Sequence, residues 1–359
     1  TRRGWTSIGT TKLESPEARG LARMLSDYDP HVVIDLHTTN GTYHGYHLTY
    51  APPLHPNTPP EIDRMLRREW LPAVTDGARQ AGWLMYYYGN VPSAEEGNPG
   101  AERGWYTFDH RPRFGTSYAG LRNRFAILSE AYAYLAFADR IRVTRDFVEE
   151  VLDYAAAHAG PIRRATAAAD AEDVRGQSLA LTARLRRTPP VPILMGEVEE
   201  QRHPYTGLPM LLRRDVVRPE PMPEFQQFDA ADTERAPAGY VVPPDAGDVL
   251  DRLRAHGVRM RAMGEAPGGL EAFVVDSTWT AERAFQGHKE RRVVGRWQPA
   301  TALPPAGSVF VPMDQPLARL VFTLLEPRSD DGFTAWNLLD PWLERRVYPI
   351  LRLPAPDRR

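Results

Sequence analysis

His31-Val32-Val33-Ile34-Asp35-Leu36-His37-Thr38-Thr39-Asn40-Gly41 is the stretch that decides the fold. Its β-branched residues predict a strand, and Asn40-Gly41 predicts the turn that ends this strand. The apolar run at residues 32–34 favours burial on both faces, as in an α/β sheet. A strand that ends in a polar turn delivers its last imidazole, here His37, to a sheet edge, where metal sites are often built.

Helices are expected on both sides of this strand. Ser15-Pro16 is typical of a helix start, and a second helix is expected to begin at Pro59-Pro60. Further strands are expected over residues 83–88 and 124–134, and a further helix over residues 145–157. The alternation predicts an α/β fold with a mixed β-sheet flanked by helices.

The second half of the chain differs in composition. An Ala- and Arg-rich segment at residues 161–187 predicts one or two helices, and the following Pro189-Pro190 breaks the pattern. We therefore expect a first domain over residues 1–157, a helical connector over 158–190 and a smaller α+β accessory domain over 191–359. In the accessory domain, helices are expected at residues 245–256 and 315–325, and strands at 272–276 and 308–311. The Gly- and Pro-rich residues 89–118 are expected to form a long surface loop, which is typical of a segment that shapes a site or is mobile.

Composition and charge exclude several classes of function. The net charge of -2, from 44 basic and 46 acidic residues, offers no footprint for nucleic acid or an anionic membrane. There is no cysteine, so any metal must be held by His, Asp or Glu. No apolar run approaches the roughly 18 residues of a membrane span, and no signal peptide opens the chain.

Asp35-x-His37 is the first candidate for chemistry. On a strand the two side chains share a face, so the carboxylate can orient the imidazole or support a neighbouring ligand. The alternative is that His37 makes an ordinary hydrogen bond at the end of a strand.

Glu130 is the second candidate, because it lies inside the apolar run Phe125-Ala126-Ile127-Leu128-Ser129-Glu130-Ala131-Tyr132. A buried carboxylate tends to have a raised pKa, which suits a general base. The equally open alternative is a structural ion pair with Arg122 or Arg124.

The remaining histidines are less informative. His37, His44 and His47 could form a three-histidine zinc site, but this reading is disfavoured because their odd spacing places His44 and His47 on opposite faces of an extended chain. His110, His203, His256 and His288 stand alone in the sequence, and surface positions suffice to explain them.

Three motifs, in order, closely resemble the zinc carboxypeptidases of the carboxypeptidase A type. They are Ser15-Pro16-Glu17-Ala18, residues 33–41, and residues 118–130. The resemblance covers roughly residues 11–155, and the second half resembles the C-terminal extension of bacterial members. It implies that His37 is the third zinc ligand, that Glu130 is the catalytic glutamate and that Asp35 supports His37.

The resemblance also implies the reaction and its partners. One zinc ion, held by two His and one Glu, would activate water for hydrolysis of a peptide with a free C-terminus. Arginines would bind the terminal carboxylate and a tyrosine would close over the substrate; Arg122, Tyr106 and Tyr118 are the candidates for substrate binding. The family resemblance further favours a periplasmic or secreted location.

The chain departs from the family in one respect that matters for activity. No His-x-x-Glu motif precedes His37, and the Asn-Arg pair expected just before Thr11 is absent. The domain is therefore expected to be N-terminally incomplete, lacking the first third, and the chain as given is expected to be inactive or impaired. Two alternatives remain open: a non-catalytic peptide-binding pseudoenzyme, and a zinc amidohydrolase of small N-acyl amino acids.

The first residues suggest a reason for this departure. The segment from Arg3 to Thr11 stands where the family has a sequence like Leu-Asp-Leu-Asn-Arg-Asp-Tyr. If the coding sequence of this segment is read in a frame shifted by two bases, its codons permit that motif. We hypothesise that residues 1 to about 10 are an out-of-frame translation of it, the alternative being a genuinely divergent N-terminus. The genomic sequence decides between them.

Overall fold

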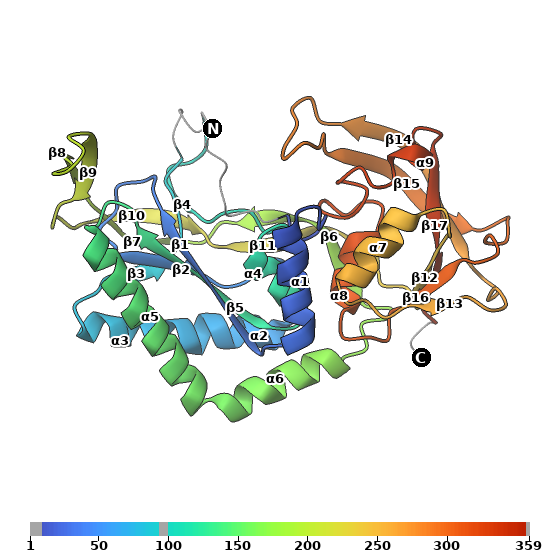
Figure 1. Cartoon of the computed structure of the whole chain (residues 1–359), viewed down its shortest axis with the longest axis horizontal. Helices are drawn as coiled ribbons and strands as arrows, with labels where there is room; N and C mark the ends of the chain where they lie inside the picture. Colours follow the sequence, from blue (N-terminus) through green and yellow to red (C-terminus); the bar gives the residue numbers. More distant parts are fainter. Residues whose placement is uncertain (1–8, 93–99, 357–359) are drawn as a thin grey trace.

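The computed structural model describes residues 9–92 and 100–356, and these form a mixed α/β protein (Figure 1). Residues 1–8, on which the frame-shift hypothesis mainly rests, lie outside the described residues. The prediction of a mixed β-sheet flanked by helices is confirmed. Within the described residues, no helix is both long and apolar enough to cross a membrane.

The sheet that carries the candidate residues has the strand order β1-β5-β2-β3. Strand β1 (Val32–Thr39) runs parallel to β5 (Phe125–Tyr132), which pairs on its other side with antiparallel β2 (Leu48–Ala51); β3 (Met85–Tyr87) follows. All of β5 is buried. Strand β1 lies at the sheet edge, and residues 32–34 are therefore only partly buried, not fully covered as predicted.

Helices cover this sheet and bury its apolar side chains. Figure 1 shows α2 (Pro60–Met65), α3 (Leu71–Gln80) and α5 (Phe137–Ala157) gathered along the sheet, with a π-helical turn, η1 (Leu66–Trp70), joining the first two. Their apolar side chains form one core with those of β2, β3 and β5. Helix α5 begins eight residues before the predicted start at residue 145.

Helix α1 (Pro16–Tyr28) confirms the predicted cap. The Ser15 hydroxyl accepts a hydrogen bond from the backbone N–H of Ala18, and Pro16 occupies the first helical turn. Asp29 ends the helix in a left-handed conformation, with φ of 45°.

A six-stranded sheet of order β13-β16-β12-β17-β14-β15 forms most of the second half. Helices α7 (Gly247–Ala255) and α8 (Ala318–Leu325) pack against it and confirm the helices predicted there. The strands of this sheet are β12 (Gly239–Val242), β13 (Arg261–Ala262), β14 (Glu271–Thr280), β15 (Arg291–Pro299), β16 (Val309–Pro312) and β17 (Val347–Leu353). A short helix, α9 (Asp340–Leu343), precedes β17.

Residues 158–235 differ from the expected helical connector. Only α6 (Ala159–Ala171) is helical, whereas residues 178–186 form β6 (Ser178–Arg186), paired with β11 (Gln227–Arg235). Ala and Arg favour a helix, but pairing with β11 overrides this local preference and makes the segment a strand.

Strand pairing also crosses the domain boundary that was expected at residue 190. Strands β7 (Pro190–Met195) and β10 (Arg218–Phe225) pair with each other, and β10 continues onto β4 (Trp105–Tyr106) of the first half. A hairpin of β8 (Val198–Arg202) and β9 (Pro209–Arg213) lies between β7 and β10 in the sequence.

A buried hydrogen-bonded group joins the two halves of the chain. The hydroxyl oxygen of Tyr118, on α4 (Gly115–Leu121), lies 2.8 Å from His256 Nδ1. His256 Nε2 lies 3.0 Å from the Thr11 carbonyl oxygen. Because a carbonyl only accepts, Nε2 donates and Nδ1 accepts from the Tyr118 hydroxyl. His256 is fully buried and His110 is also buried, so the surface positions predicted for these two histidines are wrong.

Replacing Tyr118 by Phe should lower the free energy of unfolding by about 1–2 kcal/mol, because His256 Nδ1 loses its donor in a buried setting. Urea unfolding measures this change. The matched control is Tyr205→Phe, since Tyr205 is 93% exposed and should be neutral. Equal stability of the two variants would contradict a structural role for the Tyr118 hydroxyl.

Candidate active site

The pairing of β1 with β5 assembles the candidate residues. In the parallel register, His37 lies opposite Glu130, and Asp35 lies two residues before His37 on the same face. The two strands therefore bring Glu130 beside Asp35 and His37, which precede it by more than ninety residues in sequence.

Asp35 holds the imidazole of His37. The Nε2 atom of His37 lies 2.7 Å from Asp35 Oδ1, within hydrogen-bond distance. This hydrogen bond raises the pKa of His37 above its ordinary value. Burial lowers the pKa, whereas the charges of Asp35 and Glu130 raise it further. The other ring nitrogen, Nδ1, is left for a ligand.

Glu130 is a buried carboxyl group with an unusual environment. Its side chain is 3% exposed, and its Oε2 atom has no hydrogen-bond partner. Burial raises its pKa from 4.5 to about 7; the charge of Asp35 adds to this effect, and His37 opposes it. A carboxyl group that titrates near neutrality is suited to accept and return a proton.

The structural alternative for Glu130 required an ion pair with a nearby arginine. Arg124 instead bonds to Asp29 and Asp170, and Arg122 bonds to Ser26 and to the His256 carbonyl. Neither arginine therefore stabilises Glu130 as a structural partner.

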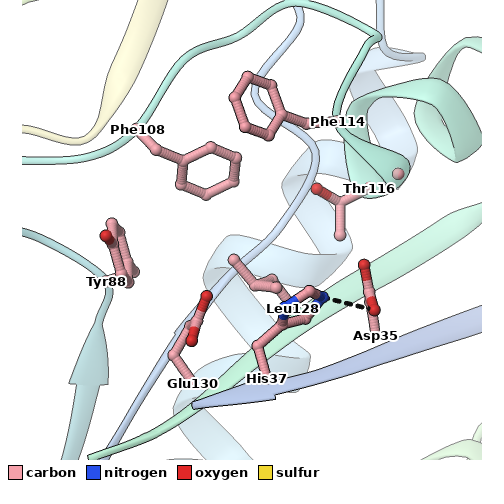
Figure 2. A pocket seen from close by; sticks show the side chains of 9 residues that line it. Asp35, His37, Tyr88, Phe108, Phe114, Thr116, Leu128 and Glu130 are labelled. Carbon is pink, nitrogen blue, oxygen red and sulfur yellow. Dashed lines mark hydrogen bonds and ion pairs between the residues drawn. The ribbon is translucent and has the colours of Figure 1, made fainter. Parts of the chain in front are cut away.

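A small cavity of about 70 Å³ lies over these residues. Figure 2 shows Glu130, His37 and Asp35 on one side of it and the rings of Phe108 and Phe114 on the opposite side. The full lining is Asp35, His37, Tyr88, Phe108, Phe114, Gly115, Thr116, Leu128 and Glu130. The cavity thus combines a polar floor with an aromatic wall, which we define as Tyr88, Phe108 and Phe114.

The side chain of Asn90 contacts both the aromatic wall and the turn after β1. The Asn90 side-chain amide donates to the Tyr88 hydroxyl at 3.0 Å, while its Oδ1 accepts from the N–H of Thr42. Gly41, with φ of +124°, allows this close approach, because a Cβ there would lie 2.5 Å from Asn90 Oδ1. The turn after β1 and the aromatic wall are therefore positioned by the same side chain.

The three substrate-binding candidates lie away from this cavity. Tyr118 is fully buried against His256, and Arg122 donates to the same group. The ring of Tyr106 stacks on Phe225 at 3.9 Å, and its hydroxyl donates to the carbonyl of Glu102. The structure places Tyr88 at the cavity instead.

His44 and His47 lie in separate surroundings from His37. His44 is buried, and His47 Nδ1 accepts a hydrogen bond from the Leu84 N–H. Burial lowers the pKa of His44 to about 3 and that of His47 to about 4. Within the described residues, no group of three or more His, Asp and Glu side chains is arranged to hold a metal ion, so this part of the chain does not fit a complete zinc site.

Sequence reasoning missed the aromatic wall, although signals were present. Tyr88 closes the aromatic run after β3, and Phe108 and Phe114 lie within the Gly- and Pro-rich segment that was expected to shape a site. The short helix α4 inside that segment was also missed. Only the fold shows that these rings face Glu130.

Comparisons with known proteins agree with part of this picture. The chain is similar to proteins called Carboxypeptidase 2 from the fungi Trichophyton equinum, Trichophyton tonsurans and Trichophyton rubrum, at 30% identity over 122 residues in each case. The matched part is 34% of this chain and spans about a fifth (22%) of the length of those relatives. No family model and no solved structure matches. The chain therefore resembles carboxypeptidases over a third of its length, which supports a peptidase-like hydrolase.

The raised pKa of Glu130 predicts how stability depends on pH. The folded state binds a proton at Glu130 more tightly than the unfolded state does, so the free energy of unfolding should fall as pH rises from 4.5 to about 7. Glu130→Gln removes this dependence. The difference in free energy of unfolding between the variant and wild type should therefore be more favourable to the variant at pH 8 than at pH 5, by about 2 kcal/mol.

Urea unfolding of the wild type and the variant at pH 5 and pH 8 measures the effect. The control is Glu149→Gln, whose parent side chain is 65% exposed. A Glu130→Gln effect that is the same at both pH values would show that Glu130 is not held in an unfavourable charged state.

Proposed function

We propose that this chain carries the general base of a carboxypeptidase-like hydrolase that releases residues from the free C-terminus of peptides. The observation that supports it is Glu130: a buried carboxyl group, without a partner at Oε2, lining a cavity beside the Asp35–His37 pair. Similarity to the fungal carboxypeptidases supports the same class of reaction.

Each residue has a defined task in this proposal. Glu130 accepts the proton of the attacking water and returns it to the leaving amine, which requires a pKa near neutrality. Asp35 fixes the ring of His37 through Nε2, so that Nδ1 is directed to a ligand. The aromatic wall excludes bulk water and strengthens electrostatic interactions within the cavity.

Zinc enters this proposal only as an expectation from the family resemblance. When bound, zinc would acidify the attacking water. The described residues offer the imidazole of His37 but no group of three ligands, so they do not fit a complete site. We propose that the chain as given is therefore impaired as an enzyme, and a non-catalytic peptide-binding protein is the alternative.

Glu130→Gln should reduce peptide hydrolysis at least ~100-fold, because glutamine cannot accept the water's proton. The assay follows release of the C-terminal amino acid by the protein in its full natural length. A C-terminally amidated peptide should resist hydrolysis, and Glu149→Gln should keep full activity. Undiminished turnover by Glu130→Gln would remove Glu130 as the base.

The chain as given should bind zinc with less than one equivalent after dialysis, because a single imidazole does not hold zinc tightly. Elemental analysis of the purified chain measures the content, and His37→Ala is the control. Tight binding of one equivalent that is lost in His37→Ala would contradict the incomplete ligand set.

A further inference from the structure

The cavity beside Glu130 is small. Its volume of about 70 Å³ is roughly half of the ~150 Å³ of an apolar cavity that binds benzene, whereas one water molecule needs only ~10–15 Å³ of such volume. The cavity therefore has room for several water molecules, or for water beside one small aliphatic group.

The aromatic wall is interlocked. The ring centroids of Tyr88 and Phe108 lie 5.5 Å apart, and those of Phe108 and Phe114 lie 5.3 Å apart, both edge to face. Such contacts add to the stability of the arrangement beyond simple burial. A group that presses on the ring of Phe108 therefore also presses on Tyr88 and Phe114.

The backbone that carries this wall is held at both ends. The N–H of Thr107 donates to the Phe225 carbonyl at 3.0 Å, and the N–H of Arg113 donates to Asp331 Oδ2 at 2.7 Å. Asp331 is fully buried and also binds the Arg113 guanidinium. Segments from the second half of the chain thus keep Phe108 and Phe114 over the cavity.

We infer that this cavity selects substrates whose scissile carbonyl carries a small group, such as acetyl, glycyl or alanyl. This inference rests on the proposed function. Because the water activated by Glu130 attacks the carbonyl carbon, the group bonded to that carbon shares the cavity with the base. The nearby Leu128 and the aromatic wall favour a small apolar side chain on this group over a polar one. Phe108, in the middle of the wall, is the residue that sets the limit.

The test compares binding of N-acetylglycine, N-isobutyrylglycine and N-benzoylglycine, which differ only in the carbonyl substituent. Isothermal titration calorimetry on the whole protein measures each Kd without requiring turnover. Wild type should bind N-acetylglycine at least about tenfold more tightly than N-benzoylglycine. Phe108→Ala should reduce this ratio to about threefold or less, since it opens the wall.

Two further variants keep the result interpretable. Phe108→Leu enlarges the cavity less than the alanine variant does and serves if that variant does not fold. It should also lower the preference for N-acetylglycine over N-benzoylglycine. Phe137→Ala, at a phenylalanine that is 70% exposed on α5, is the matched control and should leave the ratio unchanged.

The outcomes separate the two proposals. Equal binding of the acetyl and benzoyl ligands by wild type, no binding of N-acetylglycine, or an unchanged ratio in both Phe108 variants overturns size selection. If the binding order holds but the protein in its full natural length hydrolyses neither these ligands nor peptides, the proposed hydrolase fails while size selection by the cavity stands.

Discussion

The parallel pairing of β1 with β5 is the constraint on which the candidate site depends. It places His37 opposite Glu130, and the period of two along β1 places Asp35 on the same face as His37. A shift of one residue would turn Asp35 and His37 to the other face and separate them from Glu130. The apolar neighbours of Glu130 in β5 bury its carboxyl group, and this burial raises its pKa.

The second half of the chain contributes to the site through the aromatic wall. Asp331 binds both the backbone and the guanidinium of Arg113, and the guanidinium carbon also lies 4.5 Å from the centre of the Trp336 ring. Burial raises the pKa of Asp331 to about 6, while Arg113 opposes this rise. The segment between Thr107 and Phe114 is therefore shaped by residues more than two hundred positions later in the chain.

Local signals predicted much of the first half. Ser15-Pro16 marked the start of α1, and the β-branched run before His37 marked β1, because caps and strand periodicity act over a few residues. Local signals did not identify β6, whose Ala- and Arg-rich sequence suits a helix until β11 pairs with it. They also did not reveal that His256 is buried, because its partners Thr11 and Tyr118 are distant in the sequence.

The sequence by itself determined the candidate residues for chemistry: an imidazole at the end of a strand, a carboxylate two residues before it and a glutamate inside an apolar run. These are properties of residue type and short-range spacing. The tertiary structure decided that Tyr88, Phe108 and Phe114, rather than Tyr106, Tyr118 or Arg122, surround Glu130. It also decided how small the cavity is. Ring positions depend on long-range pairing and packing, which no local pattern encodes.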